Sequence, residues 1–399
     1  MYKLYCRIYQ TIFKLASAFL PWRKPELLEG INSLQNLPEI VKNRNINKVL
    51  IVTGPQIFSL GLLDVMLKGL EKEGVTYYIY NKTVQNPTID NVEDALEIYK
   101  SNNCKGIIAF GGGSPIDCAK GVACRVARPE KTIPQMKGLL KVRKNLPLLI
   151  AIPTTAGSGS ETTVAAVLSN PTTHEKYAIN DPVIIPHYAV LDPVITTGLP
   201  QHVTSTTGMD ALTHAVEAYI GRGNTKETEM MAIKATKLIF ENIYKAYSDG
   251  TDLNARGNMQ KASFYAGIAF TRAYVGYVHA VAHTLGGFYG IPHGLANAVI
   301  LPYVLESYGK SAQKRLAELA DVVDITKPTD TIENKAHKFI EAIKELNREM
   351  KIPDKIMGIN DKDIPLMVKR ADKESNPLYP VPRIMDKKEL EKIYYLIQA

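Results

Sequence analysis

Three histidines lie close together in residues 275–294, which read VGYVHAVAHTLGGFYGIPHG. His279 and His283 are four residues apart, so on a helix they would share one face. A Gly-Gly pair at 286–287 predicts the end of that helix, and the loop after it would fold back to bring His293 near His279. Three imidazoles arranged in this way can bind a divalent metal ion, transfer protons, or do both.

A second pair of polar side chains occurs upstream, in the run GMDALTH. Asp210 and His214 are also four residues apart, on one face of an otherwise apolar predicted helix. Burying a carboxylate and an imidazole there is costly unless they share a partner such as a metal. Together with His279 and His293 they would supply nitrogen and oxygen ligands that suit Zn²⁺ or non-haem Fe²⁺. A plain Asp–His hydrogen bond and ordinary core histidines are the structural alternatives.

A glycine-rich turn follows the apolar run at residues 106–110. It reads GGGS at 111–114 and continues into a predicted helix, for which Ser114 would be the N-cap and Pro115 the first residue. Asp117 would complete a pattern like a capping box. Backbone N–H groups at such a helix start bind phosphate, which favours a phosphate site over a plain turn. The pattern is not GxGxxG, so an ordinary Rossmann fold is not predicted.

The N-terminal half alternates strand and helix patterns. This alternation predicts a parallel sheet that binds its ligand at the carboxyl ends of the strands. The run PTTAGSGSE directly follows the last predicted strand, so it is expected to form a second wall of the same site, with a simple polar loop as the alternative. The predicted strands span residues 48–53, 76–80, 106–110 and 146–152, and the predicted helices span 60–72 and 92–101.

After about residue 200 the pattern becomes helical throughout. We expect helices at about 206–220, 227–246, 255–271, 278–285, 296–308, 313–320, 331–349 and 387–398. The second half is therefore predicted to be a separate all-helical domain, and two domains suit a chain of 399 residues.

The overall composition is that of a soluble globular protein, with 45% hydrophobic and 22% charged residues. The net charge of +8 is spread along the chain, which favours phosphorylated cofactors over nucleic acid. None of the four cysteines forms a CxxC pair, a usage typical of reduced, cytoplasmic proteins.

The first twenty residues are apolar but are interrupted by Lys3, Arg7 and Lys14. These scattered charges argue against a signal peptide and against an integral membrane span. We expect an amphipathic helix, packed on the body of the protein or on a partner subunit in preference to a membrane surface.

Four motifs, in this order and spacing, resemble those of the iron-containing (group III) alcohol dehydrogenases: GGGSPIDCAK, PTTAGSGSE, GMDALTHAVEAY and VHAVAHTLGGFYGIPHG. The resemblance covers nearly the whole chain after about residue 25. It implies the fold shared by that family and dehydroquinate synthase-like enzymes, an α/β dinucleotide-binding domain with a parallel sheet followed by an all-helical metal-binding domain. We therefore expect an amphipathic segment at 1–25, the α/β domain at 26–200 and the helical domain at 201–399.

The resemblance also implies roles for individual residues. His283 matches an extra histidine near the nicotinamide and the substrate. The metal ligands of the family match Asp210, His214, His279 and His293. Its cofactor contacts match Asn86, Gly112, Gly113, Ser114, Thr154, Thr155, Ser158 and Lys176.

Two features depart from the family pattern, one residue and one segment. NAD-preferring members carry an Asp after the first strand, where its charge repels a 2′-phosphate, but this chain has Gly54. NADP(H) is therefore expected to be accepted, either as well as NAD(H) or in preference to it. The N-terminal segment is also longer and more helical than usual, which could alter assembly.

The expected activity is hydride transfer, in the cleft between the domains, between a nicotinamide and a small primary alcohol or aldehyde. Fe²⁺ or Zn²⁺ would act as a Lewis acid on the substrate oxygen, and His283 would position the nicotinamide or relay a proton. The alternatives are a glycerol or polyol dehydrogenase-like enzyme, a dehydroquinate synthase-like enzyme, and a non-catalytic scaffold that docks through residues 1–20. A homodimer or larger homo-oligomer is expected, as is common in the family.

Overall fold

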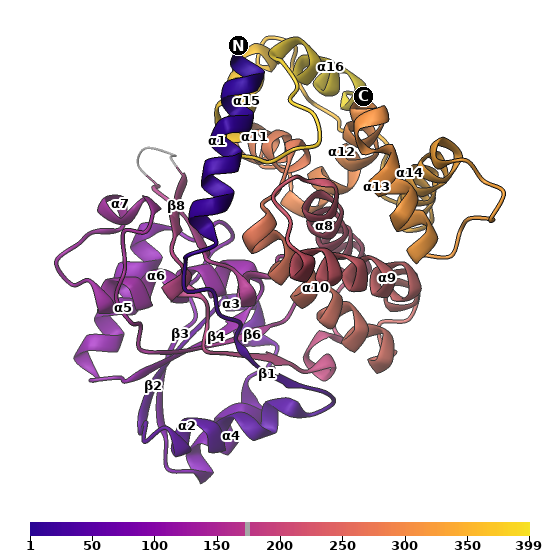
Figure 1. The fold of residues 1–399 in the computed structure, drawn as a ribbon. Coiled ribbons are helices and arrows are strands. Elements are labelled where there is room, and N and C mark those ends of the chain that lie inside the picture. Colours follow the sequence, from indigo (N-terminus) through magenta and orange to yellow (C-terminus); the bar gives the residue numbers. More distant parts are fainter. Residues whose placement is uncertain (172–175) are drawn as a thin grey trace. The chain divides into compact units, whose positions relative to one another are not determined.

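The computed structural model describes residues 1–171 and 176–399 (Figure 1). The chain divides into two compact units. The α/β unit spans Pro21–Gly198, and the helical unit combines Met1–Leu20 with Leu199–Ala399. The first twenty residues therefore pack with the C-terminal half of the chain.

The α/β unit contains a six-stranded sheet in the described residues, of order β1-β9-β6-β4-β2-β3, with every neighbouring pair parallel. The predicted parallel sheet is thus confirmed. A smaller sheet has the order β5-β8-β7. The strands are β1 (Glu26–Glu29), β2 (Lys48–Thr53), β3 (Thr76–Tyr80), β4 (Gly106–Gly111), β5 (Gly138–Leu139), β6 (Leu148–Pro153), β7 (Ala165–Ser169), β8 (Lys176–Asn180) and β9 (Tyr188–Leu191).

Helices cover both faces of the large sheet because its central strands are apolar on both sides. In β2, Val49 and Ile51 pack in the core shared with α2 and α4, whereas Leu50 and Val52 pack in the core shared with α5 and α6 (Figure 1). This period of two is what a strand requires. The helices are α2 (Leu37–Asn43), α3 (Pro55–Ser59), α4 (Asp64–Lys72), α5 (Ile89–Ser101), α6 (Gly113–Ala127) and α7 (Ile133–Met136), with 3-10 turns at Ser33–Asn36, Ser160–Thr162, Pro182–Ile184 and Pro193–Thr196.

The helical unit is built around α8, which is buried over most of its length. Its helices are α1 (Tyr2–Ser17), α8 (Gln201–Ile220), α9 (Lys226–Ser248), α10 (Leu253–Ala273), α11 (Tyr277–Tyr289), α12 (His293–Tyr308), α13 (Lys310–Val322), α14 (Ile332–Glu349), α15 (Ile364–Ser375) and α16 (Lys387–Ile397). No helix in the described parts of the chain has both the length and the apolar character needed to cross a membrane. All four cysteines are buried and unpaired.

The end of α11 corrects one prediction. The helix does not stop at the Gly-Gly pair at 286–287 but continues to Tyr289, because glycine inside a helix costs stability without breaking it. Gly290, at φ +66°, ends the helix in the left-handed conformation that favours glycine. His293 is consequently the first residue of the next helix and does not belong to a long loop.

His187, just before β9, should make stability depend on pH. Its Nδ1 accepts a hydrogen bond from the Leu149 backbone N–H at 3.1 Å. Burial, and then the nearby Arg23 charge, lower the pKa of His187 to about 4. Because the pKa of an unfolded histidine is about 6.5, the folded state binds fewer protons, and stability should fall as the pH drops from about 6.5 to 4.

We expect the thermal midpoint of the wild type to fall more steeply through this pH window than that of a His187→Asn variant. The asparagine oxygen can accept the same hydrogen bond but does not titrate. Melting followed by circular dichroism between pH 8 and 4 would measure both. Parallel curves for the two proteins would show that His187 is not responsible.

Candidate metal centre and nucleotide-binding loops

Asp210, His279 and His293 come together in the helical unit from α8, α11 and α12. Their potential ligand atoms all lie within 4.8 Å of one another. Asp210 Oδ1 is 3.9 Å from His279 Nε2 and 3.6 Å from His293 Nε2. Asp210 and His279 are buried, whereas the His293 side chain is 41% exposed. The cluster therefore combines two buried potential ligands, which hold their geometry, with one potential ligand that solvent or a small molecule can approach.

The donor set of this cluster fits a divalent cation. The Asn297 amide nitrogen lies 2.7 Å from Asp210 Oδ1, 3.2 Å from His279 Nε2 and 3.1 Å from His293 Nε2. An amide has two protons to offer, yet three acceptor atoms converge on it. Its own Oδ1 is buried and accepts no hydrogen bond from the described residues. Electron pairs that converge on one point, from nitrogen and oxygen atoms, are what Fe²⁺ or Zn²⁺ requires.

His214 lies beside this cluster but is not one of the three converging residues. Its ring stacks on His279, with ring centroids 4.5 Å apart, and on Phe270, with centroids 4.0 Å apart. Its side chain is buried on the same face of α8 as Asp210. A ligand role for His214 stays a prediction.

Glu217 is a buried partner of the cluster that the sequence reasoning missed. Its Oε2 accepts hydrogen bonds from His279 Nδ1 at 2.6 Å and from the Gly276 N–H at 2.8 Å, and its Oε1 accepts one from the Val278 N–H at 2.8 Å. Burial raises the pKa of Glu217 to about 7, although the backbone hydrogen bonds oppose this shift. The spacing could have revealed it, because Asp210, His214 and Glu217 follow an i, i+4, i+7 pattern.

The Glu217 contact determines which nitrogen of His279 carries the proton and which one offers an electron pair to the cluster. Burial, with the neighbouring imidazoles adding to it, holds the pKa of His279 well below its usual value, so its ring is neutral. A neutral imidazole that donates from Nδ1 to Glu217 leaves Nε2 with a free electron pair on the side of Asp210 and Asn297. This is the form in which histidine binds a metal.

His283 has a carboxylate partner of its own. Its Nδ1 is 2.6 Å from Glu374 Oε1 on α15, which also accepts a hydrogen bond from the Tyr379 hydroxyl at 2.8 Å. The His283 ring stacks on His293 with centroids 5.1 Å apart, and its side chain is 39% exposed. No sequence spacing could reveal Glu374, which lies 91 residues from His283.

Gly294 allows α12 to begin directly against α8. A Cβ at this position would lie 2.4 Å from the backbone oxygen of Thr206, so any side chain must push the start of α12 away. We expect Gly294→Ala to displace His293 from Asp210 and to weaken metal binding at least tenfold, which competition with a chelator would measure. Gly287→Ala is the matched control, because its Cβ would meet nothing within 4 Å. Equal metal affinity in the two variants would contradict this expectation.

The predicted nucleotide-binding loops lie in the α/β unit, after neighbouring strands. Gly54 follows β2, Gly112 follows β4 and Thr154 follows β6, and β4 lies between the other two strands. A Cβ on Gly112 would be 3.4 Å from Thr155 Oγ1, and one on Gly113 would be 3.1 Å from Ser158 Oγ. Glycine therefore lets the GGGS and PTTAGSGS loops lie in direct contact.

The start of α6 corrects the capping prediction. Gly112 is the N-cap and Ser114 is the second helical residue, so Ser114 does not cap the helix. Asp117 does not complete a capping box, because its carboxylate accepts hydrogen bonds from Ser160 Oγ at 2.6 Å and the Val167 N–H at 3.1 Å. Since no side chain of the described residues caps α6, its first N–H groups are open to an anion such as phosphate.

Asn86 and Lys176 are also brought together in the α/β unit. Lys176 Nζ donates to Asn86 Oδ1 at 3.2 Å, and Asn86 has a φ of +55°, which asparagine tolerates better than most residues. The structure thus pairs two of the predicted cofactor residues, whose cofactor role stays a prediction.

Comparisons with known proteins follow the division into two units. Residues 25–193 match the family described as iron-containing alcohol dehydrogenase, and residues 204–397 match the C-terminal part of the Fe-containing alcohol dehydrogenase family. Alcohol dehydrogenase 4 of Schizosaccharomyces pombe is 39% identical over 88% of this chain and 84% of its own length. The NAD-dependent methanol dehydrogenase of Bacillus methanolicus is 33% identical over 91% of this chain and 96% of its own.

Solved structures agree. The structure of an alcohol dehydrogenase from Oenococcus oeni matches with a TM-score of 0.91 and 34% identity, over 95% of this chain and all of that one (100%). The chain therefore belongs to the iron-containing alcohol dehydrogenase family. It is an enzyme, an oxidoreductase with the fold of that family.

Proposed function

We propose that the protein catalyses the reversible, NAD(P)-linked conversion of a small primary alcohol to its aldehyde. The observation that carries this proposal is the convergence of Asp210 Oδ1, His279 Nε2 and His293 Nε2 on one point in a largely buried setting. The names of the relatives, an alcohol dehydrogenase and a methanol dehydrogenase, support the substrate class.

In this proposal Asp210, His214, His279 and His293 hold Fe²⁺, with Zn²⁺ as the alternative. The metal would supply a Lewis acid that polarises the substrate oxygen. Glu217 fixes the tautomer of His279, and the partial exposure of His293 leaves that side of the cluster open to a small substrate.

His283 is proposed to handle the proton of the alcohol. Because its Nδ1 donates to Glu374, its Nε2 is the ring nitrogen that would accept a proton in one direction and return it in the other. The ring is partly exposed and stacks on His293, so it lies beside the proposed metal ligands without being one of them.

The cofactor is proposed to bind the α/β unit through the open start of α6. Gly112, Gly113 and Ser114 would hold the pyrophosphate. Thr154, Thr155, Ser158, Asn86 and Lys176 would supply further contacts, and Gly54 would leave room for a 2′-phosphate.

We also propose that the enzyme is a cytoplasmic homo-oligomer.

The test is aldehyde-dependent oxidation of NADPH and NADH by apoprotein reloaded with Fe²⁺ or Zn²⁺. Turnover that requires the metal is the expected result. No turnover across several aldehydes with either cofactor would overturn the proposal. If the enzyme oxidised only glycerol or other polyols, the hypothesis of a polyol dehydrogenase-like enzyme would replace it.

Gly54→Asp should shift the cofactor preference toward NADH by tenfold or more, because the new carboxylate would repel a 2′-phosphate. The position accepts a side chain, since its nearest neighbour to a Cβ is the Thr83 oxygen at 3.4 Å. Gly54→Asn is the matched control, of equal size but uncharged. The ratio of kcat/KM values for NADPH and NADH would measure the effect, and an unchanged ratio in Gly54→Asp would show that this residue does not face the ribose.

A further inference from the structure

Helix α1 grips a segment near the other end of the chain. Arg7 Nη1 and Nη2 donate to the carbonyl oxygens of Val381 at 2.7 Å and Pro382 at 2.9 Å. Gln10 Nε2 donates to those of Pro377 at 3.0 Å and Tyr379 at 2.8 Å. These side chains thus hold most of the carbonyl groups of residues 377–382, which we call the gripped segment.

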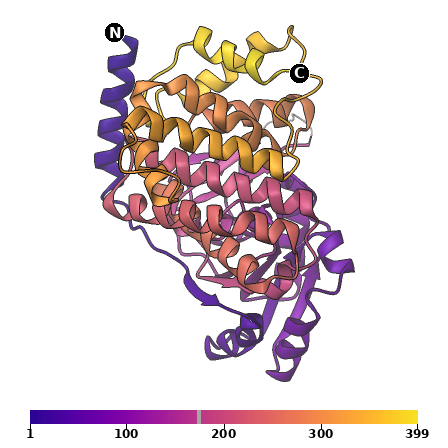
Figure 2. The same ribbon diagram turned by 90° about the vertical axis from the view of Figure 1, so that its right-hand side faces the viewer.

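The contact is partly buried, and most deeply so at Gln10. Gln10 is 8% exposed, and its Oε1 accepts from Arg7 Nη1 at 2.8 Å, so both the donors and the acceptor of its amide are used. Burying such an amide is unfavourable unless its hydrogen bonds are made, so the geometry is strongly specified. The contact extends along α1, which runs along one edge of the helical unit (Figure 2). The Phe13 ring packs edge-on against the Tyr274 ring, with ring centroids 5.5 Å apart.

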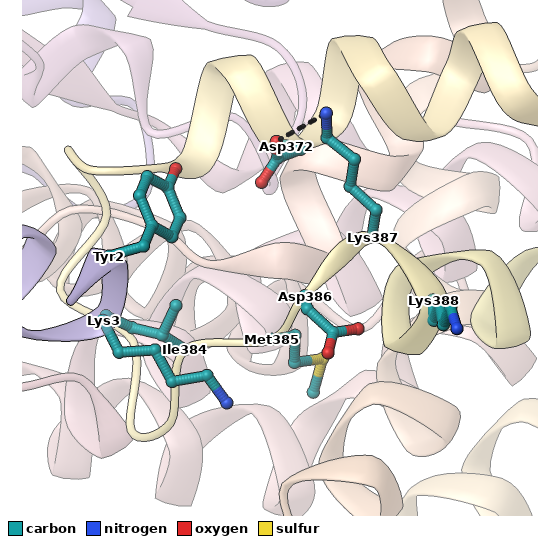
Figure 3. Close-up of a pocket in the computed structure, with 8 residues that line it drawn as sticks. All are labelled: Tyr2, Lys3, Asp372, Ile384, Met385, Asp386, Lys387 and Lys388. Carbon is teal, nitrogen blue, oxygen red and sulfur yellow. Dashed lines mark ion pairs between the residues drawn. The ribbon is translucent and has the colours of Figure 1, made fainter.

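The first turn of α1 also faces the end of the chain. Tyr2 and Lys3 line an open hollow together with residues 384–388 and Asp372, which makes an ion pair with Lys387 at 3.8 Å (Figure 3). The predicted metal and cofactor residues do not line this hollow, so it is not part of the proposed active site. The hollow shows instead that α1 lies against the helical unit before Arg7, at Tyr2 and Lys3, just as it does after Gln10, at Phe13.

The gripped segment carries Tyr379, and Tyr379 leads to the proposed active site. Its ring is buried and its hydroxyl donates to Glu374 Oε1, the same oxygen that accepts from His283 Nδ1. A carboxylate oxygen fixed by two donors has a defined position, and so does the imidazole that depends on it. Without Arg7 and Gln10, the carbonyl groups of Pro377, Val381 and Pro382 would lose these partners, while the Tyr379 oxygen would keep its hydrogen bond from the Val381 N–H at 2.8 Å. The position of Tyr379 would then be less well defined.

We propose that Arg7 and Gln10 are positioning residues for His283, acting through the gripped segment, Tyr379 and Glu374. The N-terminal helix would thereby help to orient a side chain of the proposed active site. The proposal rests on the proposed function, because it takes His283 to be the proton-handling group.

The test compares Gln10→Ala, Tyr379→Phe and the double variant with Thr11→Ala as control. Thr11 is exposed, and its hydroxyl bonds to the Arg7 carbonyl within α1. We expect Gln10→Ala and Tyr379→Phe each to lower kcat for aldehyde reduction about tenfold while the KM for the cofactor stays unchanged. The double variant should lose no more than either single variant, since both break one connected path. If the double variant instead lost kcat by the product of the two single effects, the two residues would act independently and the proposal would be overturned.

A second readout does not depend on activity. Nitrogen NMR of ¹⁵N-labelled histidine rings, assigned with His283→Gln, reports whether His283 carries its proton on Nδ1. Gln10→Ala should move this signal toward a mixture of tautomers, and Thr11→Ala should not. An unchanged signal in folded Gln10→Ala would refute the positioning role even in an active enzyme. A changed signal in a protein that reduces no aldehyde would support the positioning and refute only the proposed function.

If Gln10→Ala does not fold, Gln10→Glu keeps the partner of Arg7 but removes both donors to the gripped segment. The same shift of the His283 signal is then expected. Its absence would count against the proposal as in the alanine variant.

Discussion

Replacing His279 by alanine should remove tight metal binding and lower metal-dependent turnover about a thousandfold or more. The substitution deletes a buried nitrogen at the point where the Asp210 and His293 atoms converge. Lewis-acid stabilisation contributes several kcal/mol to a transition state, and each 1.36 kcal/mol is a factor of ten in rate. Metal content after dialysis, together with aldehyde-dependent oxidation of NAD(P)H, would measure the loss.

The control for this experiment is His337→Ala. His337 is an exposed histidine on α14, so its replacement should change neither metal content nor rate. A His279→Ala protein that remained fully active after chelation would show that the metal site has been assigned to the wrong residues.

Glu217→Gln should weaken metal binding about ten- to a hundredfold, although none of the proposed metal ligands is changed. Glu217 accepts hydrogen bonds from the Gly276 and Val278 backbone N–H groups and from His279 Nδ1. A glutamine presents its amide NH₂ group, itself a donor, to at least one of these donors. Where it faces His279, the imidazole must accept at Nδ1 and carry its proton on Nε2, the atom that would bind the metal.

The structure supplies a matched control for Glu217→Gln. Glu374→Gln makes the same change at the other carboxylate–histidine pair, where the distance is also 2.6 Å but the histidine is not a proposed ligand. Competition with a chelator should show reduced metal affinity in Glu217→Gln and wild-type affinity in Glu374→Gln, with circular dichroism to verify folding. The same affinity for all three proteins would rule out the proposed tautomer control.

The sequence was sufficient to predict elements whose own residues determine them. β2 and β4 are continuous apolar runs, and α9 and α14 have a clear helical period, so their predicted limits were close. β1 was missed because its sequence, ELLE, places charged residues at both ends of a four-residue strand. The helix α15 was missed as well, since its sequence mixes scattered apolar positions with many charges.

The candidate site divides in the same way. Spacing within one helix was enough to group Asp210 with His214 and His279 with His283. It could not show that Asn297 stands at the point of convergence, or that Glu374 orients His283, because these contacts depend on how separate helices pack. The capping error at Ser114 has a related cause, since the extended backbone of Gly112 starts α6 before the serine.

The helical unit is discontinuous along the chain, and this affects how it can be synthesised. Helix α1 is synthesised before the α/β unit and before the rest of the helical unit, yet Arg7 finds its partner at Val381, 374 residues later. Its outward residues Leu4, Ile8 and Ile12 are more than half exposed even in the finished fold, and the nascent helix also lacks its partners on the other side. Because domains generally fold as they emerge, the α/β unit should fold first while α1 waits unpaired. The docking of α1 therefore has to wait until residues 377–382 have been made, and products truncated before this segment would display an amphipathic helix that chaperones and proteases can recognise.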